Sequence, residues 1–173
     1  PFDLGDVDIS RAQPFQRNKR YLFERSKEAL GLLYADHYPY KQKETSRGVR
    51  RSPFHSQFEK KGAVFGEIAG WERPNWFAES DQKPIYEYSW KRQNWFKNSQ
   101  REHEAIRQNV GLYDMSSFGK IKIEGKSAKA FLNHVCGADL SVPNGKIVYT
   151  QFLNKKGGIE ADVTVTRLTE TEY

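Results

Sequence analysis

One carboxylate in the last third of the chain lies where its residue type is unusual. Asp162 is inside the segment 159–166, which is rich in β-branched residues and alternates like a β-strand. Aspartate is depleted in strands, so this carboxylate is a candidate functional group that could accept a proton or orient a donor. A solvent-facing aspartate on a half-exposed strand is the competing interpretation, and the pattern alone leaves both open.

The elements around Asp162 predict a β-hairpin. Strand formers at Tyr149 and Phe152 precede a turn-rich segment, residues 154–158, and the strand of Asp162 follows it. Alternation places Asp162 on the same face as Glu160 and two threonines, with the valines on the other face. We therefore expect Asp162 on the polar face of the hairpin.

Composition limits the size of the core and the kinds of site. The chain has 173 residues, of which 37% are hydrophobic, enough for one modest domain or parts of two. Cys136 is the only cysteine, and the four histidines lack metal-ligand spacing, so we predict no disulfide and no metal site. No apolar run approaches the roughly 18 residues of a membrane span, and no signal-peptide pattern is visible.

Positive charge is concentrated in the first part of the chain. The net charge is +6, and residues 11–61 are strongly basic and interleaved with tyrosine and phenylalanine. Such a surface could bind nucleic acid, pack on another domain or meet an anionic cofactor. No helix-turn-helix, RRM or zinc pattern accompanies the charge, so we do not expect nucleic acid as a partner.

The two halves of the chain differ in pattern. The first has few aliphatic residues and predicts an extended segment at 3–8, a helix at 13–34, a short helix at 52–61 capped by Ser52, a strand at 64–70 and a loop at 71–77. The second predicts a regular α+β arrangement, with helices at 101–109 and 127–135, a strand at 118–124 and the hairpin. A turn at 169–172 would lead into a further strand, which indicates a piece of a longer polypeptide.

The second half resembles the aminomethyltransferase (glycine-cleavage T-protein) family. Matching segments occur in the family's order at residues 69–74, 103–107, 110–119, 124–125, 130–132, 138–139, 149–154 and 157–162. The first half resembles the connector of the dimethylglycine and sarcosine dehydrogenases, in which an FAD amine-oxidase part precedes a folate-binding part. Its matching segments are residues 17–21, 28–34, 48–53 and 71–77.

The resemblance implies a fold, a domain division and an activity. The fold would be α+β, a partial T-protein-like folate-binding domain preceded by an irregular, partly helical connector. Residues 1–70 would be the connector from an FAD oxidoreductase domain absent from this chain, and 71–173 the N-terminal part of the tetrahydrofolate-binding domain. The parent enzyme would demethylate dimethylglycine or sarcosine and pass the one-carbon unit to tetrahydrofolate, giving 5,10-methylenetetrahydrofolate.

The same resemblance assigns site residues. Asp162 matches the family's catalytic aspartate, and Tyr149 and Phe118 match positions that line the folate pocket. Ala161 replaces the first acid of the family's usual Asp-Asp pair, so the role would fall to Asp162 alone.

Two other functions remain open from the sequence, a stand-alone aminomethyltransferase of the glycine cleavage system and a non-catalytic regulatory homologue. The partners implied are folate, a small N-methyl amine and the upstream FAD domain, with no nucleic acid and no membrane. We also expect self-association of the isolated chain, because its aromatic segment and final strand lack partners. The location implied is the cytoplasm of a bacterium or the mitochondrial matrix of a eukaryote.

Overall fold

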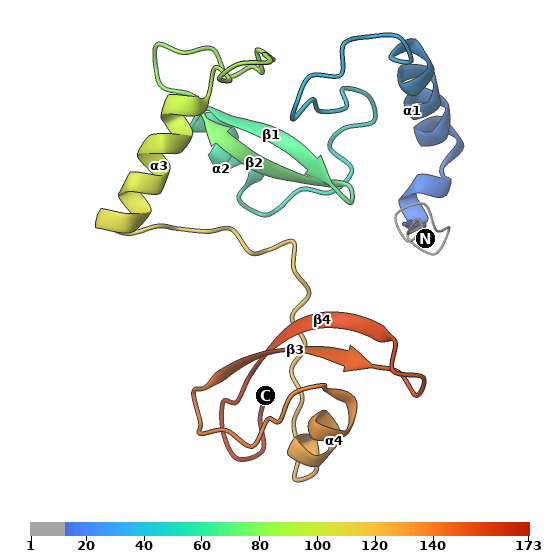
Figure 1. Cartoon of the computed structure of the whole chain (residues 1–173), viewed down its shortest axis with the longest axis vertical. Coiled ribbons are helices and arrows are strands. Elements are labelled where there is room, and N and C mark those ends of the chain that lie inside the picture. Colours follow the sequence, from blue (N-terminus) through green and yellow to red (C-terminus); the bar gives the residue numbers. More distant parts are fainter. Residues whose placement is uncertain (1–12) are drawn as a thin grey trace. The chain divides into compact units, whose positions relative to one another are not determined.

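The computed structural model describes residues 13–173, so the segment predicted at residues 3–8 lies outside it. Contacts divide the chain into two compact units, one ending at Phe118 and the other spanning Gly119–Tyr173. The first unit contains several helices and the second contains one, and each has one two-stranded antiparallel sheet (Figure 1). The predicted α+β class is therefore confirmed.

The sheet of the first unit is a hairpin of β1 (Ala63–Ile68) and β2 (Trp71–Phe77). The prediction of a loop at 71–77 is wrong. Ala69 and Gly70 both adopt positive φ, 49° and 81°, which closes a tight two-residue turn and pairs the flanking segments. Pro74 is tolerated because it lies beside an irregularity in the register of the two strands, between the pairs Val64–Trp76 and Phe65–Pro74.

Two helices accompany this hairpin. The predicted short helix is present as α2 (His55–Lys60), but the predicted cap is wrong: Phe54 is at the N-cap, and the hydroxyl of buried Ser52 accepts the N–H of Phe54 at 3.2 Å, too early in the chain to cap the helix. α3 (Phe96–Gln108) begins five residues before its predicted start, because buried Asn98 ties its first turn to the carbonyl of Phe77 at 2.7 Å. None of the helices within residues 13–173 is long and apolar enough to cross a membrane.

The remaining helix of the first unit, α1 (Lys19–Gly31), begins at an asparagine cap. After a 3-10 turn at Pro14–Arg17, the Asn18 side chain accepts two N–H groups of the first helical turn. The helical segment predicted at 13–34 is confirmed with shorter ends. Arg25 of α1 forms an ion pair with Glu67 of β1.

No residue of α1 is buried. Its exposed apolar side chains, with those of the turn after it, are Leu22, Phe23, Leu30, Leu33 and Tyr34. An apolar surface of this kind favours association. We expect the isolated chain to show a mass above its monomeric 20.1 kDa in size-exclusion chromatography with light scattering. Phe23→Glu should shift it toward the monomer, and a monomer at every concentration would contradict the prediction.

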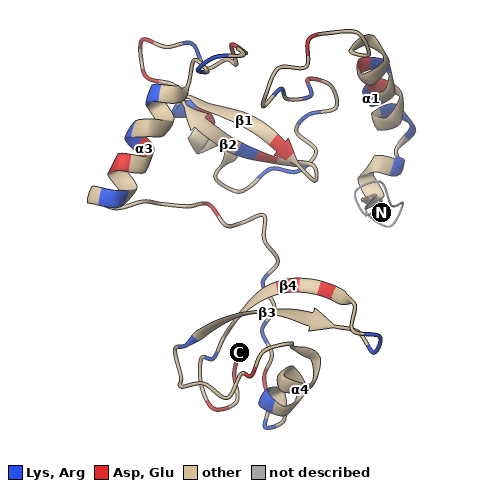
Figure 2. Cartoon of the chain, viewed as in Figure 1, with Lys and Arg blue, Asp and Glu red and all other residues tan. Residues whose placement is uncertain are grey.

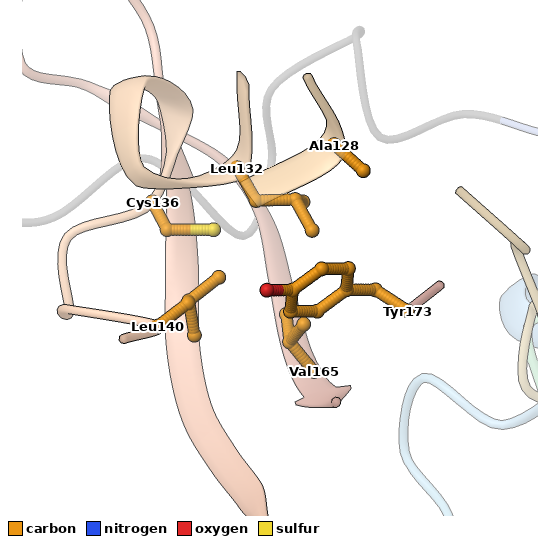
Figure 3. Close-up of a cluster of buried hydrophobic side chains, with 6 residues drawn as sticks. All are labelled: Ala128, Leu132, Cys136, Leu140, Val165 and Tyr173. Atoms are coloured by element: carbon orange, nitrogen blue, oxygen red, sulfur yellow. The ribbon is translucent and has the colours of Figure 1, made fainter. Parts of the chain in front are cut away.

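The second unit packs one helix on a hairpin. α4 (Ala128–Val135) covers one face of β3 (Ile147–Leu153) and β4 (Ile159–Thr166). The ring of Tyr173 points into the cluster between them (Figure 3). Cys136 is a small buried member of this cluster, with a free thiol. The buried cluster consists of Ala128, Leu132, Cys136, Leu140, Val165 and Tyr173.

The prediction of a strand at 118–124 is wrong. Only the end of this segment is paired, through reciprocal bonds of 3.0 Å between Ile123 and Tyr173 and one bridge between Glu124 and Glu172. The segment after β4 first forms a turn, in which the N–H of Leu168 bonds to the carbonyl of Glu172 at 2.9 Å. The predicted turn at 169–172 is present, and residues 171–173 pair with 123–125 through these bonds.

Candidate functional site

The hairpin that carries Asp162 is built by its turn. The Asn154 side chain accepts the N–H groups of Lys156 and Gly158, both at 2.9 Å, and Gly157 adopts a φ of 79°. These contacts fix the register, in which Gln151 lies directly opposite Asp162. The predicted strand, turn and strand are confirmed.

The two faces of the hairpin have different surroundings. Val163 and Val165 face the helix and the buried cluster, whereas Asp162 is exposed on the other face. Tyr149 is on that exposed face too, with 64% of its surface accessible. Figure 2 shows the acidic positions on β4 beside an uncharged β3. The predicted placement of Asp162 on the polar face is confirmed.

Two side chains of β3 contact the Asp162 carboxylate. The amide nitrogen of Gln151 donates to its Oδ1 at 3.3 Å. The Tyr149 hydroxyl also hydrogen-bonds to Asp162, and this bond is the main reason that the pKa of Tyr149 is raised, with desolvation and the carboxylate's charge adding to it. A raised pKa keeps the phenol protonated, so it remains a donor. The arrangement orients a carboxylate that can accept a proton or a hydrogen bond from a ligand.

Phe118 lies in the first unit, in the loop that ends it. Its ring is 57% exposed, and the Arg73 guanidinium carbon is 5.9 Å from the ring centroid. The structure thus brings Asp162 and Tyr149 together within one hairpin and places Phe118 in the other unit. Within residues 13–173 no group of three His, Cys, Asp or Glu side chains is arranged to hold a metal ion.

Two residues of interest were missed by sequence reasoning, Gln151 and Arg73. Gln151 lies two residues after Tyr149, so strand alternation puts both on one face, and the turn residues could have supplied the register. Arg73 lies in the segment 69–74 that resembles the family, but its supporting role had no signal, because its contacts are with residues more than 40 positions later in the chain.

Comparison with known families matches both parts of the chain. The model of the GCVT N-terminal domain matches residues 54–173, and that of the FAD dependent oxidoreductase central domain matches residues 1–52. The predicted division at residue 70 falls in the turn of the β1–β2 hairpin, and it stays a prediction.

Individual proteins agree with these matches. The chain is 46% identical over 167 residues to 4-methylaminobutanoate oxidase (formaldehyde-forming) of Paenarthrobacter nicotinovorans, covering 96% of this chain and 20% of that protein. It is 32% identical over 195 residues to mitochondrial sarcosine dehydrogenase of Homo sapiens, covering 96% and 21%. The solved aminomethyltransferase T of Bartonella henselae matches with a TM-score of 0.56 and 28% identity, covering 72% of this chain and 30% of that one.

The chain spans about a fifth of the length of these two oxidoreductases. The alignments with them cover 96% of this chain. Along the chain, the match to the FAD dependent oxidoreductase central domain comes first and the match to the GCVT N-terminal domain follows it. The chain belongs to the GCVT N-terminal domain family, in the group whose members also carry an FAD dependent oxidoreductase central domain.

Proposed function

We propose that the chain is part of an FAD-dependent dehydrogenase that demethylates a small N-methyl amine, dimethylglycine or sarcosine. The one-carbon unit passes to tetrahydrofolate and gives 5,10-methylenetetrahydrofolate. The observation that carries this proposal is the succession of the two family matches, residues 1–52 and 54–173, in one chain. A stand-alone aminomethyltransferase would not account for the first match.

The proposal assigns roles to three side chains. Asp162 is the catalytic carboxylate, and Tyr149 and Phe118 contact folate. An aromatic surface beside a carboxylate suits a planar heterocycle that carries N–H donors. The exposed hairpin face around Asp162 supports this assignment, since Gln151 and Tyr149 orient the carboxylate from one side.

The transfer step needs a group that takes up a proton. A flavin bound in the upstream domain would supply hydride acceptance, by which the N-methyl amine becomes an iminium. Two folate nitrogens then each form a bond to the iminium carbon, while its bond to the amine nitrogen breaks. Each folate nitrogen loses its proton, so one proton leaves with the departing amine and the other goes to Asp162 and on to water. The carboxylate thereby acts as general base.

The partners follow from these roles. We propose tetrahydrofolate and the amine as substrates and an upstream FAD domain as the neighbour of residues 1–70, with no nucleic acid and no membrane among the partners. Residues 71–173 would be the folate-binding part. The enzyme would act in the cytoplasm of a bacterium or in the mitochondrial matrix of a eukaryote.

A second candidate activity is supported by the 46% identical relative, whose name describes oxidation of 4-methylaminobutanoate with formation of formaldehyde. Assays of the intact enzyme distinguish the two candidate activities. With sarcosine, dimethylglycine and 4-methylaminobutanoate offered separately, the specificity constants identify the amine. Formation of methylenetetrahydrofolate when folate is present supports the transfer function, whereas free formaldehyde at an unchanged rate with folate supports the second candidate.

We expect the isolated 173-residue chain to bind no flavin. A phosphate-cradling loop needs clustered glycines that open a helix. Gly66 is instead paired with Arg73 inside the β1–β2 ladder, and Gly62 and Gly70 lie at its ends. The chain mixed with excess FAD and then desalted should show no visible flavin absorbance. Stoichiometric bound flavin would contradict the prediction.

A further inference from the structure

The loop that ends the first unit, residues 114–118, is held by polar contacts. The Asp114 carboxylate accepts the N–H of Ser116 at 2.9 Å and also hydrogen-bonds to the hydroxyls of Ser116 and Ser52. Burial acts to raise the pKa of Asp114, but these hydrogen bonds and the charge of Arg73 lower it overall. Asp114 is therefore a charged acceptor, and it ties the loop to Ser52, which is itself buried.

Arg73 of β2 contacts the same loop at three places. Its Nη2 donates to the carbonyl oxygen of Asp114 at 3.0 Å, and its Nη1 donates to the hydroxyl of Ser117. The guanidinium carbon is also 5.9 Å from the centre of the Phe118 ring. A planar guanidinium can make two directed hydrogen bonds and lie against an aromatic ring at once, whereas a lysine ammonium is a single compact charge.

Phe118 is more than half exposed although it is a large apolar side chain at the end of a loop that is held by these contacts. Exposed aromatic rings on loops fixed by supporting hydrogen bonds are typical of binding surfaces, since the ring is in place before the ligand arrives. The contacts above fix the backbone on the N-terminal side of Phe118 and touch the ring itself. Arg73 does both.

We propose that Arg73 is a positioning residue for folate binding, which acts by holding the 114–118 loop and the ring of Phe118. This inference rests on the proposed function, in which Phe118 contacts folate. Arg73 itself needs no contact with the ligand.

The test uses the intact enzyme with Arg73→Lys. Losing one directed hydrogen bond and the ring contact should raise the Kd for tetrahydrofolate about tenfold. The kcat of dye-coupled amine oxidation should not change. Isothermal titration calorimetry gives the Kd without turnover. An unchanged Kd in this variant would overturn the inference.

A matched control is present in the same unit. The Arg92 guanidinium carbon lies 4.6 Å from the ring centre of Phe96, so Arg92→Lys makes the same change at another arginine–phenylalanine contact. It should leave the Kd unchanged. Phe118→Leu, alone and combined with Arg73→Lys, completes a double-mutant cycle. If Arg73 acts through Phe118, the double variant binds about as weakly as Phe118→Leu alone; additive losses would overturn the inference.

Ser117→Ala separates positioning from folding, because it removes one acceptor of Arg73 and little else. It should raise the Kd less than Arg73→Lys does, at an unchanged melting temperature. A Kd that instead tracks the melting temperature through all variants would assign Arg73 a structural role.

If Phe118→Leu weakens folate binding and Arg73→Lys does not, this inference alone fails. An intact enzyme that binds no tetrahydrofolate would overturn the proposed function together with the inference.

Discussion

Replacing Asp162 by asparagine in the intact enzyme should lower the formation of methylenetetrahydrofolate by about 10²–10⁴-fold, the usual contribution of one acid–base group. Dye-coupled oxidation of the amine should remain largely intact, because that step does not use this carboxylate. The iminium would then react with water, and formaldehyde should appear in place of the folate product. Asparagine keeps the size of the side chain and can still accept from Gln151, so the hairpin should be preserved.

Glu160→Gln is the matched control for this experiment. Glu160 is an exposed acid on the same strand, and its carboxylate accepts from the Asn154 side chain at 2.7 Å. Neutralising it removes the same charge without touching the Tyr149 and Gln151 contacts. Both products should form at normal rates in this variant. An equal loss of oxidation and transfer in Asp162→Asn would instead show that Asp162 is structural.

The hairpin of the second unit could be predicted because its determinants are local. Turn residues at 154–158 and alternation on either side specify both strands and the face on which Asp162 lies. The contact between Tyr149 and Asp162 was harder to foresee. It depends on the register and on an irregularity between Phe152 and Leu153, neither of which alternation reveals.

Non-local contacts explain the two wrong assignments. β2 contains Glu72 and Pro74, which are both poor strand residues, and the buried Glu72 carboxylate is satisfied by Arg47 and the Gly48 N–H, 25 and 24 residues earlier in the chain. Residues 118–124 have the alternation of a strand, but the segment available to pair with them is mostly a turn. In both cases the structure of the segment depends on the distant part of the chain that it contacts. A short window of sequence contains no information on that distant part.

The candidate site was predictable to a similar extent. Family resemblance supplied Asp162, Tyr149 and Phe118, and strand alternation independently supplied the exposure of Asp162. The supporting residues Gln151 and Arg73 act through contacts across a ladder or between a strand and a distant loop. Such supporting contacts follow from tertiary structure, so their residue types alone do not mark them.

The second large effect is expected on the stability of the first unit. Glu72 is only 5% exposed, and its carboxylate accepts from Arg47 Nε at 2.9 Å, from Arg47 Nη2 at 2.5 Å and from the Gly48 N–H at 2.6 Å. Arg47 also donates to the carbonyls of Lys43 and Phe65. The pair therefore joins β2 to the segment before α2. Glu72→Gln should lower the free energy of unfolding by about 3 kcal/mol, because it leaves a partly buried guanidinium, 26% exposed, without its counter-charge.

Urea unfolding of the chain, followed by tryptophan fluorescence, measures this loss. Glu79→Gln is the control. Glu79 forms an ion pair with Arg101, and the two side chains are 47% and 60% exposed, respectively. An exposed pair of this kind should contribute less than about 1 kcal/mol to the free energy of unfolding. Replacing both partners with apolar residues, Arg47→Met with Glu72→Leu, should recover most of the stability.

The pH dependence of this loss gives a further check on the charge pair. Burial acts to raise the pKa of Glu72, but the hydrogen bonds from Arg47 and Gly48 lower it overall from its usual 4.5. A lowered pKa in the folded state means that the stabilisation is complete above pH 4.5 and is lost as the pH falls through the folded-state pKa. The difference between wild type and Glu72→Gln should therefore shrink in acid. A difference that stays constant down to the acid transition would show that packing, and not the charge pair, is responsible.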